Sequence, residues 1–383
     1  MTRSATNIAA VLTARGRGAV ATVAFRGDVG RIDAAGVFRA ANGKRLVQQP
    51  LNRIAFGRWG DDPEEEVVVC RIAADRLEIH CHGGDAAVAR VLALLADAGV
   101  EQLDWREFLA ETEDRFAADA ATALATAATS RTAAVVARQI DGPLRDLFSW
   151  LATIDPVTHR DDVLSTVERA LAWSEFGRHL TQPWRVVLYG EPNVGKSSLV
   201  NALVGFERAI VFDRPGTTRD VVTAESAIDG WPIRFSDTAG IRAGAEEIEA
   251  AGIERAKAEL ASADLCIRVF DASVDTEDER FEDPPGQTPL IVFNKCDLPP
   301  ATRHQRHEGL AVSARTGAGL RELMSAIVRR LLPRVPAADE AVPITGRQID
   351  VLHAARSALI EDDRESLAEA LNRLRPLTKT PLR

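Results

Sequence analysis

The octapeptide GEPNVGKS, at positions 190–197, has the residue types and the spacing that phosphate chemistry needs. The apolar run RVVLY precedes it and a segment with helical apolar spacing follows, so a strand, a glycine loop and the start of a helix are predicted. A helix N-terminus presents free backbone N–H groups and a positive dipole end, which attract phosphate. A chance glycine turn would lack the flanking strand and helix, so we favour a phosphate loop. Its predicted phosphate-binding residues are Asn193, Val194, Gly195, Lys196, Ser197 and Ser198, with Lys196 on the β- and γ-phosphates and the Ser197 hydroxyl on Mg²⁺.

A second motif, NKCD, ends the apolar run LIVFN and predicts which base is bound. The ionised carboxylate of Asp297 only accepts hydrogen bonds, which suits the two donors that guanine offers on N1 and on its exocyclic amine, whereas adenine has an acceptor at N1. Asn294 can bond the other edge of the base, and the stem of Lys295 can lie along its face. In the segment SAR, which contains Ser313 and Ala314, the Ala314 N–H is predicted to bind the guanine oxygen. The nucleotide is therefore predicted to be GTP rather than ATP.

Two further segments are predicted to contact the γ-phosphate and the metal. The motif DTAG follows the run WPIRFSD, so that Asp237 can reach the water shell of Mg²⁺ and the Gly240 N–H can sense the γ-phosphate. The motif GTTRD supplies a loop in which Thr218 completes the Mg²⁺ shell when GTP is bound. The first switch contains Phe212, Asp213, Arg214, Pro215, Gly216, Thr217 and Thr218, and the second begins with Asp237, Thr238, Ala239 and Gly240.

The residue after DTAG is Ile241, at the place where many GTPases carry the glutamine that orients the attacking water. An isoleucine side chain can neither donate nor accept that hydrogen bond. Water positioning is therefore expected to come from another group.

The composition restricts the class of protein. A chain of 383 residues with 46% hydrophobic content can form two or three domains. Its formal charge of −9 argues against a large basic surface, so any nucleic-acid contact is expected to use a local patch. The four cysteines form no Cys-x-x-Cys pair, which argues against a zinc cluster or a disulfide framework. With no signal-peptide core and no apolar run of the ~20 residues that span a bilayer, a cytoplasmic protein without membrane contacts is expected.

The patterns along the chain predict an α/β plus α fold. Residues 1–111 read as a small α+β domain whose helix stops at Gly99. Residues 183–334 alternate strands with helices, which is typical of a doubly wound domain with parallel pairing; its expected strands are RVVLY, WPIRFSD, LCIRVFD and LIVFN.

Two other segments are expected to be helical. Residues 112–182 are rich in alanine and have helical apolar spacing, including a run from Val136 to Leu151. Residues 335–383, which begin within a proline-bearing linker, return to helical spacing. We expect this second segment to pack on the first, so that the nucleotide domain interrupts a helical domain.

Several stretches together resemble the nucleotide domain of the MnmE (TrmE) family of bacterial tRNA-modification GTPases: GEPNVGKSS, FERAIVFDRPGTTRD, DTAGIR, AGIERAKAEL and NKCD. The stretches NIAAVLTARGRGAV and EIHCHGG resemble the family's first domain, and the likeness covers nearly the whole chain in order. The resemblance implies a homodimeric GTPase, with the same helical domain split by the nucleotide domain. It also implies work with the flavoprotein MnmG on the wobble uridine of certain tRNAs.

The family hydrolyses GTP without a glutamine, through a potassium ion near the phosphates and dimerisation of the nucleotide domains. The resemblance implies a K⁺ site at Asn193, completed by backbone carbonyls of Phe212, Arg214 and Thr217. A cation there would supply the charge that an arginine finger brings in other GTPases. The resemblance also implies that Glu249, just before the GIER stretch, is catalytic; without it, a carboxylate in this charged run would be interpreted as a solvated helix residue.

The resemblance is weakest for the folate-binding residues. In the family an arginine in a VRISG-like segment helps to bind formyl-tetrahydrofolate, but the matching segment TVAFRG has Ala24 at that place. A second arginine has no counterpart in REFLAETEDRFAADAA, and Glu78 in EIHCHGG is the one folate residue that can be matched. The chain ends in NRLRPLTKTPLR rather than in the family's Cys-x-Gly-Lys. These departures argue against formyl-tetrahydrofolate binding and one-carbon transfer.

His80 and His82 flank Cys81 in a predicted strand and could be mistaken for a metal cluster. Adjacent strand residues point to opposite faces, so the three side chains are not expected to converge on one ion. Cys81 is expected to be a small buried hydrophobic residue.

Two alternative functions stay open. One is a GTPase switch or scaffold that binds a partner but has lost the tRNA-modifying and folate chemistry. The other is a ribosome-assembly GTPase of the Era or Der type, against which the chain has a single phosphate loop and a tail of helical spacing without a GxxG nucleotide clamp.

Overall fold

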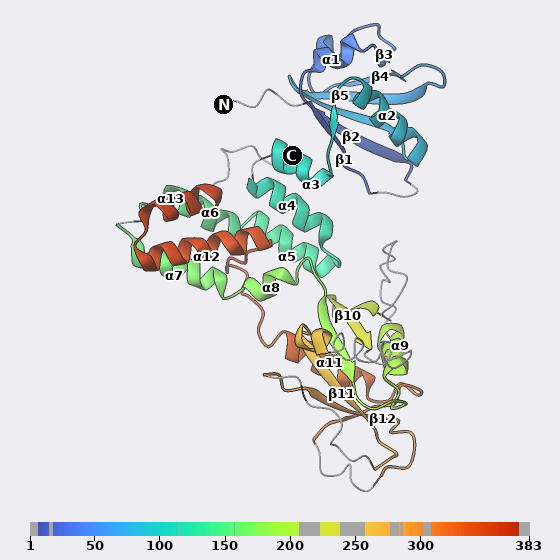
Figure 1. Cartoon of the computed structure of the whole chain (residues 1–383), viewed down its shortest axis with the longest axis vertical. Coiled ribbons are helices and arrows are strands. Elements are labelled where there is room, and N and C mark those ends of the chain that lie inside the picture. Colours follow the sequence, from blue (N-terminus) through green and yellow to red (C-terminus); the bar gives the residue numbers. More distant parts are fainter. Residues whose placement is uncertain are drawn as a thin grey trace, which may run out of the picture. The chain divides into compact units, whose positions relative to one another are not determined.

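The computed structural model describes residues 7–14, 18–113, 115–156, 158–206, 223–237, 257–275, 283, 286–301 and 308–374. The chain forms two compact units, Met1–Ala118 and Asp119–Arg383 (Figure 1).

The first unit is built on a seven-stranded sheet with the order β3-β4-β5-β6-β2-β1-β7 among the described residues. All neighbours are antiparallel except β1 and β7, which are parallel. The strands are β1 (Ile8–Val11), β2 (Val20–Arg26), β3 (Phe38–Ala40), β4 (Ile54–Trp59), β5 (Glu65–Ala73), β6 (Arg76–His82) and β7 (Glu101–Gln102). The helical elements of this part are α1 (Val29–Ala34), the 3-10 turn η1 (Leu46–Gln48), α2 (Asp85–Asp97) and α3 (Trp105–Thr112).

Alternation along the strands explains how this unit buries its core. In β6, Leu77, Ile79 and Cys81 are buried, whereas the residues between them are partly exposed or exposed. Helix α2 covers the buried face through Val91 and Leu95, both 0% exposed. The predicted helix stop is confirmed, because Gly99 has a φ of +76°, in the left-handed region that favours glycine.

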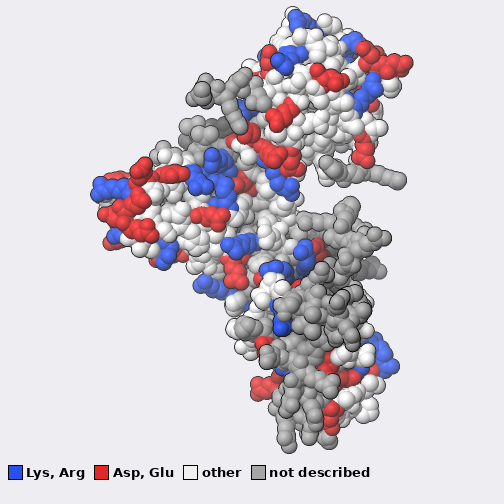
Figure 2. Space-filling model, viewed as in Figure 1, with Lys and Arg blue, Asp and Glu red and all other residues white. Residues whose placement is uncertain are grey.

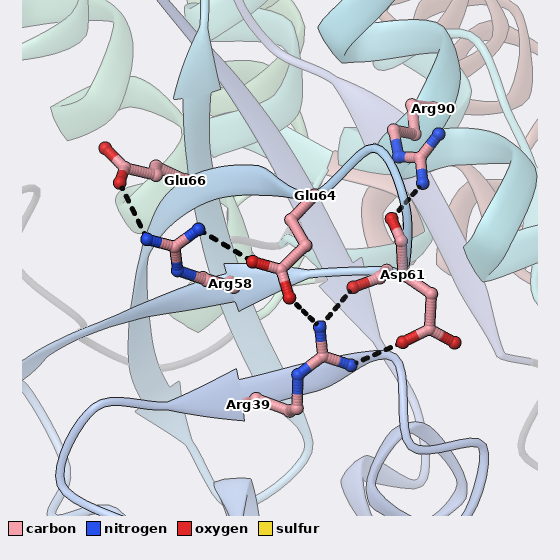
Figure 3. Close-up of polar contacts among 7 residues, drawn as sticks. Arg39, Arg58, Asp61, Glu64, Glu66 and Arg90 are labelled. Atoms are coloured by element: carbon pink, nitrogen blue, oxygen red, sulfur yellow. Dashed lines mark hydrogen bonds and ion pairs between the residues drawn. The ribbon is translucent and has the colours of Figure 1, made fainter.

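Charged side chains of both signs are interspersed over the coloured part of the surface in Figure 2. Figure 3 shows one such group, a set of ion pairs that holds the loop between β4 and β5 in place. Arg39 donates to Asp61 at 2.7 Å and to Glu64 at 2.5 Å, and Arg58 donates to the second oxygen of Glu64 at 2.7 Å. These bonds from Arg58 and Arg39 lower the pKa of Glu64. The group orders a surface connection, and exposed pairs of this kind contribute little to stability.

A bundle of helices forms one part of the second unit. It contains α4 (Arg115–Thr126), whose first residues belong to the first unit, and α5 (Ser130–Ile140), α6 (Pro143–Thr153), α7 (Arg160–Leu171), α8 (Ser174–Arg178), α12 (Gly346–Glu361) and α13 (Arg364–Leu374). The single helical run expected from Val136 to Leu151 is wrong in one respect, because α5 ends at Ile140 and α6 begins at Pro143. Proline lacks an N–H and fits the first position of a helix, so it starts the second helix.

Helices from the two ends of this unit lie side by side in the bundle (Figure 1). Helix α12 contacts α7 and α13, and α13 also contacts α6. The Arg160 guanidinium donates to the Leu359 carbonyl at 2.8 and 2.6 Å, near the C-terminus of α12. Residues about 200 positions apart in the sequence therefore share one helical core.

The nucleotide part has a six-stranded sheet with the order β13-β12-β11-β8-β10-β9 among the described residues. Its elements are β8 (Trp184–Tyr189), α9 (Lys196–Phe206), β9 (Thr223–Ile228), β10 (Trp231–Asp237), β11 (Leu265–Asp271), β12 (Leu290–Asn294), β13 (Leu310–Ala311) and α11 (Leu320–Leu331). All four strands expected from the apolar runs are present, and they pair in parallel. Edge strand β9 is antiparallel to β10, which makes the sheet mixed.

The helical bundle and the nucleotide sheet meet around His179, which is 9% exposed. Its ring stacks on Trp184 with centroids 3.6 Å apart, and its Nδ1 donates to the Gln182 carbonyl at 3.2 Å. Burial lowers the pKa of His179, although Asp264, with an oxygen 3.6 Å from Nε2, opposes the shift. The ring is therefore held neutral in the folded protein.

This predicts a specific loss of stability in acid. In the unfolded chain histidine gains a proton below about pH 6.5, whereas folded His179 resists protonation, so unfolding becomes easier as the pH falls below that value. His179→Phe keeps an aromatic ring on Trp184 but cannot titrate. We expect the drop in melting temperature between about pH 7 and about pH 5.5 to be smaller in this variant than in the wild type. An equal drop in both proteins, measured by circular dichroism, would contradict the assignment.

Candidate nucleotide-binding site

The predicted phosphate loop connects β8 to α9, and its two terminal glycines are required by close contacts. Gly190 has a φ of +139°, and a Cβ there would lie 2.3 Å from the Val269 carbonyl oxygen. Gly195 has a φ of +92°, and a Cβ there would lie 2.4 Å from Nδ2 of Asn294. Any larger residue would push the loop away from the neighbouring strands. The glycine spacing of the motif is therefore explained by backbone geometry.

Lys196 begins α9 and is 4% exposed. Its ammonium donates to the carbonyls of Gly190 at 3.1 Å and Glu191 at 2.8 Å. These bonds compensate for burying the charge inside the loop. The structure thus holds the lysine in the loop beside the first residues of a helix, where backbone N–H groups are free of intrahelical partners.

Ser197 and Asp237 come from different elements and meet in the structure. Ser197 lies in the first turn of α9, and Asp237 ends β10 and is 1% exposed. The Ser197 hydroxyl donates to Oδ2 of Asp237. A hydroxyl and a carboxylate oxygen are hard donors of the kind that Mg²⁺ prefers, so the two residues fit a shared magnesium site.

Asn294, which ends β12 and is 2% exposed, joins three segments through one amide group. Its Nδ2 donates to the Val194 carbonyl in the phosphate loop at 2.9 Å. Its Oδ1 accepts the Ala314 N–H at 3.0 Å. The expected base-binding segments and the phosphate loop are therefore physically connected.

Lys295 adds a second connection to the phosphate loop. Its ammonium donates to the Asn193 carbonyl at 2.8 Å and to Oδ2 of Asp271 at 2.6 Å. Lys295 and Asn193 have φ values of +65° and +64°, a backbone conformation that is unfavourable for residues other than glycine. Burial alone would raise the pKa of Asp271, but hydrogen bonds from Lys295 and Ser273 outweigh burial and leave the pKa lowered. An ionised Asp271 thus anchors the lysine.

Asp297 lies beside the SAR segment. Its Oδ1 accepts the Ser313 hydroxyl at 2.6 Å, and its Oδ2 pairs with Arg315 at 2.7 Å. The Ser313 bond, with a further contribution from Arg315, lowers the pKa of Asp297. The carboxylate is therefore an acceptor at neutral pH, as guanine recognition requires.

A cavity of about 490 Å³ lies at these residues. It is lined by Gly195, Ser198, Asn294, Lys295, Asp297, Leu298, Ala314 and Arg315. A larger cavity, of about 770 Å³, lies in the helical bundle between α6 and α7. The larger cavity shares no residue with the motifs, so we identify the smaller one with the base site.

Several predicted site residues lie outside the described residues. They are Thr238, Ala239 and Gly240 of the second switch, all of the first switch from Phe212 to Thr218, and Glu249 and Ile241. Among the described candidates, Ser197 bonds to Asp237, Asn294 bonds to Val194 and Ala314 and lies against Gly195, and Lys295 bonds to Asn193. The Lys196 ammonium bonds within the same loop, to the carbonyls of Gly190 and Glu191. Ser313 and Asp297 bond to each other, and Ser198 lines the same cavity.

The candidates in the first unit lie on its sheet. Glu78 is paired across the strands with Ala24 on one side and Cys70 on the other, and its carboxylate is 3.6 Å from Nε2 of His80. Cys81 is 4% exposed on the α2 side, and burial raises its pKa. The histidines on either side of it belong to the opposite face of the sheet, as the alternation predicts.

Two residues of the site were missed by sequence reasoning. Asp271 anchors Lys295, and Arg315 pairs with Asp297. Asp271 could have been found, because ligands of open α/β sheets bind at the carboxyl ends of the strands and Asp271 ends β11. Arg315 carries no comparable signal, since an exposed arginine in a loop is common.

The fold and the linked motifs define a P-loop GTPase. Residues 185–295 match the model of a family described as 50S ribosome-binding GTPase. The tRNA modification GTPase MnmE of Synechococcus sp. (strain RCC307) is 34% identical over 398 residues, which covers 92% of this chain and 87% of that protein. Its counterpart in Geobacillus kaustophilus (strain HTA426) is 34% identical over 93% of this chain and 88% of its own length. The counterpart in Bacillus subtilis (strain 168) is 33% identical over 79% and 76%.

The chain therefore belongs to the MnmE family of tRNA modification GTPases, and it is a GTP-hydrolysing enzyme. Among its described residues no helix has the length and apolar character needed to cross a bilayer.

The geometry around Asp297 predicts how the base preference can be changed. In Asp297→Asn the amide offers one acceptor and one donor, so it opposes the exocyclic amine of guanine but matches the carbonyl that xanthine has in its place. Losing a hydrogen bond to a charged group costs ~1.5–3 kcal/mol, so GTP affinity should fall at least about 10-fold while xanthosine triphosphate binds better. Competition binding with GTP, xanthosine triphosphate and ATP measures this. The surface variant Asp339→Asn is the control; unchanged GTP preference in Asp297→Asn would refute the role of this carboxylate.

Proposed function

We propose that this chain binds and hydrolyses GTP in support of wobble-uridine modification of tRNA, in the manner of its family. The observation that carries the proposal is the single linked site in which Lys196, the Ser197–Asp237 pair and the Asn294 amide meet. A phosphate loop that is tied to a guanine-selective motif has both parts that GTP needs.

The proposed roles follow from the contacts. Lys196 exchanges its loop carbonyls for the β- and γ-phosphates, and the loop N–H groups from Asn193 to Ser198 bind the remaining phosphate oxygens. Ser197 and Thr218 would hold Mg²⁺, with Asp237 reaching its water shell, and the metal would neutralise phosphate charge. Asn294, Lys295 and Asp297 bind guanine, with Ser313 fixing the Asp297 carboxylate and Ala314 offering its N–H. In the second switch Thr238, Ala239 and Gly240 contact the γ-phosphate.

Hydrolysis without a glutamine is the second part of the proposal. Ile241 has no polar atom in its side chain, and the resemblance implies that Glu249 positions the attacking water. Asn193 is exposed at the loop and, with carbonyls of Phe212, Arg214 and Thr217, is the proposed K⁺ site. Bound Mg²⁺ and K⁺ would neutralise the charge that develops on the phosphate oxygens. A homodimer of nucleotide domains would exclude bulk solvent from this site while leaving the one attacking water in place.

We also propose that the nucleotide domain, residues 183–334, is inserted in a helical domain formed by residues 112–182 and 335–383, after an N-terminal domain of residues 1–111. Support comes from bonds that cross the insertion. Besides Arg160, Gln139 donates to the Glu340 carbonyl at 3.0 Å, and Arg356 pairs with Glu168 at 3.0 Å. An inserted domain can pass nucleotide-driven movement to both of its connections.

The proposed partners are tRNA and an MnmG-type flavoprotein, by family membership. Formyl-tetrahydrofolate is left out, because the strand neighbours of Glu78 are Ala24 and Cys70, neither of which offers a cation to a folate carboxylate. The same observation favours a second candidate function. In that case the chain is a GTPase switch that binds a partner without modifying tRNA.

Turnover of GTP in potassium and in sodium buffer tests the proposal. We expect faster turnover in potassium, and Lys196→Ala should reduce it by at least about 100-fold because the phosphate charge loses its buried cation. Lys44→Ala, in the first unit, is the control and should leave turnover unchanged. Nucleoside analysis of tRNA from a deletion strain then separates the candidates. Loss of the wobble modification supports the first, unchanged tRNA with active GTPase supports the switch, and retained turnover in Lys196→Ala refutes the phosphate-loop assignment.

A further inference from the structure

The hairpin of β9 and β10 runs between the nucleotide site and the helical bundle. At one end β10 finishes with Asp237, which is bonded to Ser197. At the other end the turn of Asp229 and Gly230 contacts α5. The Thr129 hydroxyl donates to the Gly230 carbonyl at 2.7 Å, and Arg131 donates to both the carbonyl and the carboxylate of Asp229, at 2.8 Å each.

The first residue after the turn strengthens this attachment. Trp231 is 3% exposed, and the Arg131 guanidinium lies 4.6 Å from the centroid of its ring. Phe176 of α8 meets the same ring edge to face, with centroids 5.5 Å apart. A Cβ on Gly230, whose φ is +71°, would lie 3.0 Å from the Cβ of Arg131. Backbone, ion-pair and aromatic contacts therefore hold one turn against two helices.

Strand β10 is suited to carry movement along its length. Ile233 and Phe235 are 0% exposed, and the strand is paired with β8 on one side and β9 on the other. Such a strand shifts as a unit, since bending would break ladder bonds and core packing together. At ~3.3 Å per residue its seven residues span about 20 Å. A change at Asp237 on binding Mg²⁺ and GTP can thus reach the turn.

We propose that Thr129 and Arg131 are positioning residues that couple the nucleotide state to the helical domain through the β9–β10 hairpin. The biological role of this coupling rests on the proposed function, in which movement of the helical domain serves tRNA modification. Arg131 donates to Asp229 and lies over the Trp231 ring, so it acts on the nucleotide site through Trp231 and the turn. The coupling is reciprocal in principle, since a helical domain that holds the turn in one position also biases Asp237.

The test is amide hydrogen exchange of the full chain, with and without a non-hydrolysable GTP analogue and Mg²⁺. In the wild type the analogue should change exchange in peptides from β9 and β10 and in peptides from the N-terminal turn of α5. In Arg131→Ala the change in the hairpin should remain and the change in α5 should be lost. Arg356→Ala removes an ion pair elsewhere in the bundle and should respond as the wild type does. An α5 response that persists in Arg131→Ala would overturn the proposal.

A second variant and a second readout keep the test independent of folding and of the proposed function. Asp229→Asn removes the charge but tolerates the left-handed backbone of this position, where φ is +48°, and should weaken the α5 response. If Arg131→Ala does not fold, this variant alone decides: an undiminished α5 response refutes the coupling. GTP turnover should stay within about 2-fold of wild type in the uncoupled variants, because no group at the phosphates is changed. Reduced wobble modification in cells carrying Arg131→Ala would connect the coupling to tRNA modification. Unchanged tRNA in the deletion strain would reject the proposed function, but the coupling measured by hydrogen exchange would still be valid.

Discussion

The buried amide of Asn294 is the interaction on which the rest of the nucleotide site depends. Strands β8, β11 and β12 end at the same edge of the sheet, but parallel pairing alone does not fix the loops that follow them. From the end of β12, Asn294 fixes the loop after β8 by donating to the Val194 carbonyl, and the loop after β13 by accepting the Ala314 N–H. Leaving the buried amide N–H or C=O group of Asn294 without a hydrogen-bond partner costs ~1–3 kcal/mol. The need to satisfy both groups therefore favours this one arrangement of the two loops. Lys295 then bonds to both Asn193 and Asp271, so that hydrogen bonds connect the expected base site to the phosphate loop.

A helix or strand could be predicted from the sequence where its burial produces a clear pattern of apolar residues. The runs LCIRVFD and LIVFN were found because strands buried on both faces have near-continuous apolar sequences. Strand β9 was missed, since its sequence TAESAI has no apolar run and, among the described strands, it lies at the edge of the sheet beside β10. The division between α5 and α6 was also missed. Both helices bury residues in the same core, so the helical period continues across the turn, and Pro143 was the signal that should have ended it.

The residues of the candidate site differ in the same way: some were predictable from their local sequence, and others only from the tertiary structure. Gly190, Lys196 and Ser197 act within one loop, so their spacing alone describes what they do. Asp271 is 24 residues from the lysine that it binds, and Arg131 is 98 residues from Asp229. No spacing rule relates such partners, because the distance between them is set by the order of strands in the sheet. Partners such as Asp271 and Arg131 were therefore found only in the structure, whereas the phosphate-loop residues were predicted from their spacing alone.

Helix α5 has a particular position in the proposed arrangement, in which the nucleotide domain is inserted in the helical domain. Its N-terminal turn holds the hairpin through Thr129 and Arg131, and near its C-terminal end Gln139, which is 0% exposed, holds the segment that leaves the nucleotide domain. The Gln139 amide donates to the Glu340 carbonyl and accepts the Val342 N–H, each at 3.0 Å. Helix α5 thus bonds both to the β9–β10 hairpin and to the segment that follows the nucleotide domain. Because both attachments are on the same helix, a shift of the hairpin relative to the exit must either strain α5 or move it against the bundle on which its buried face packs.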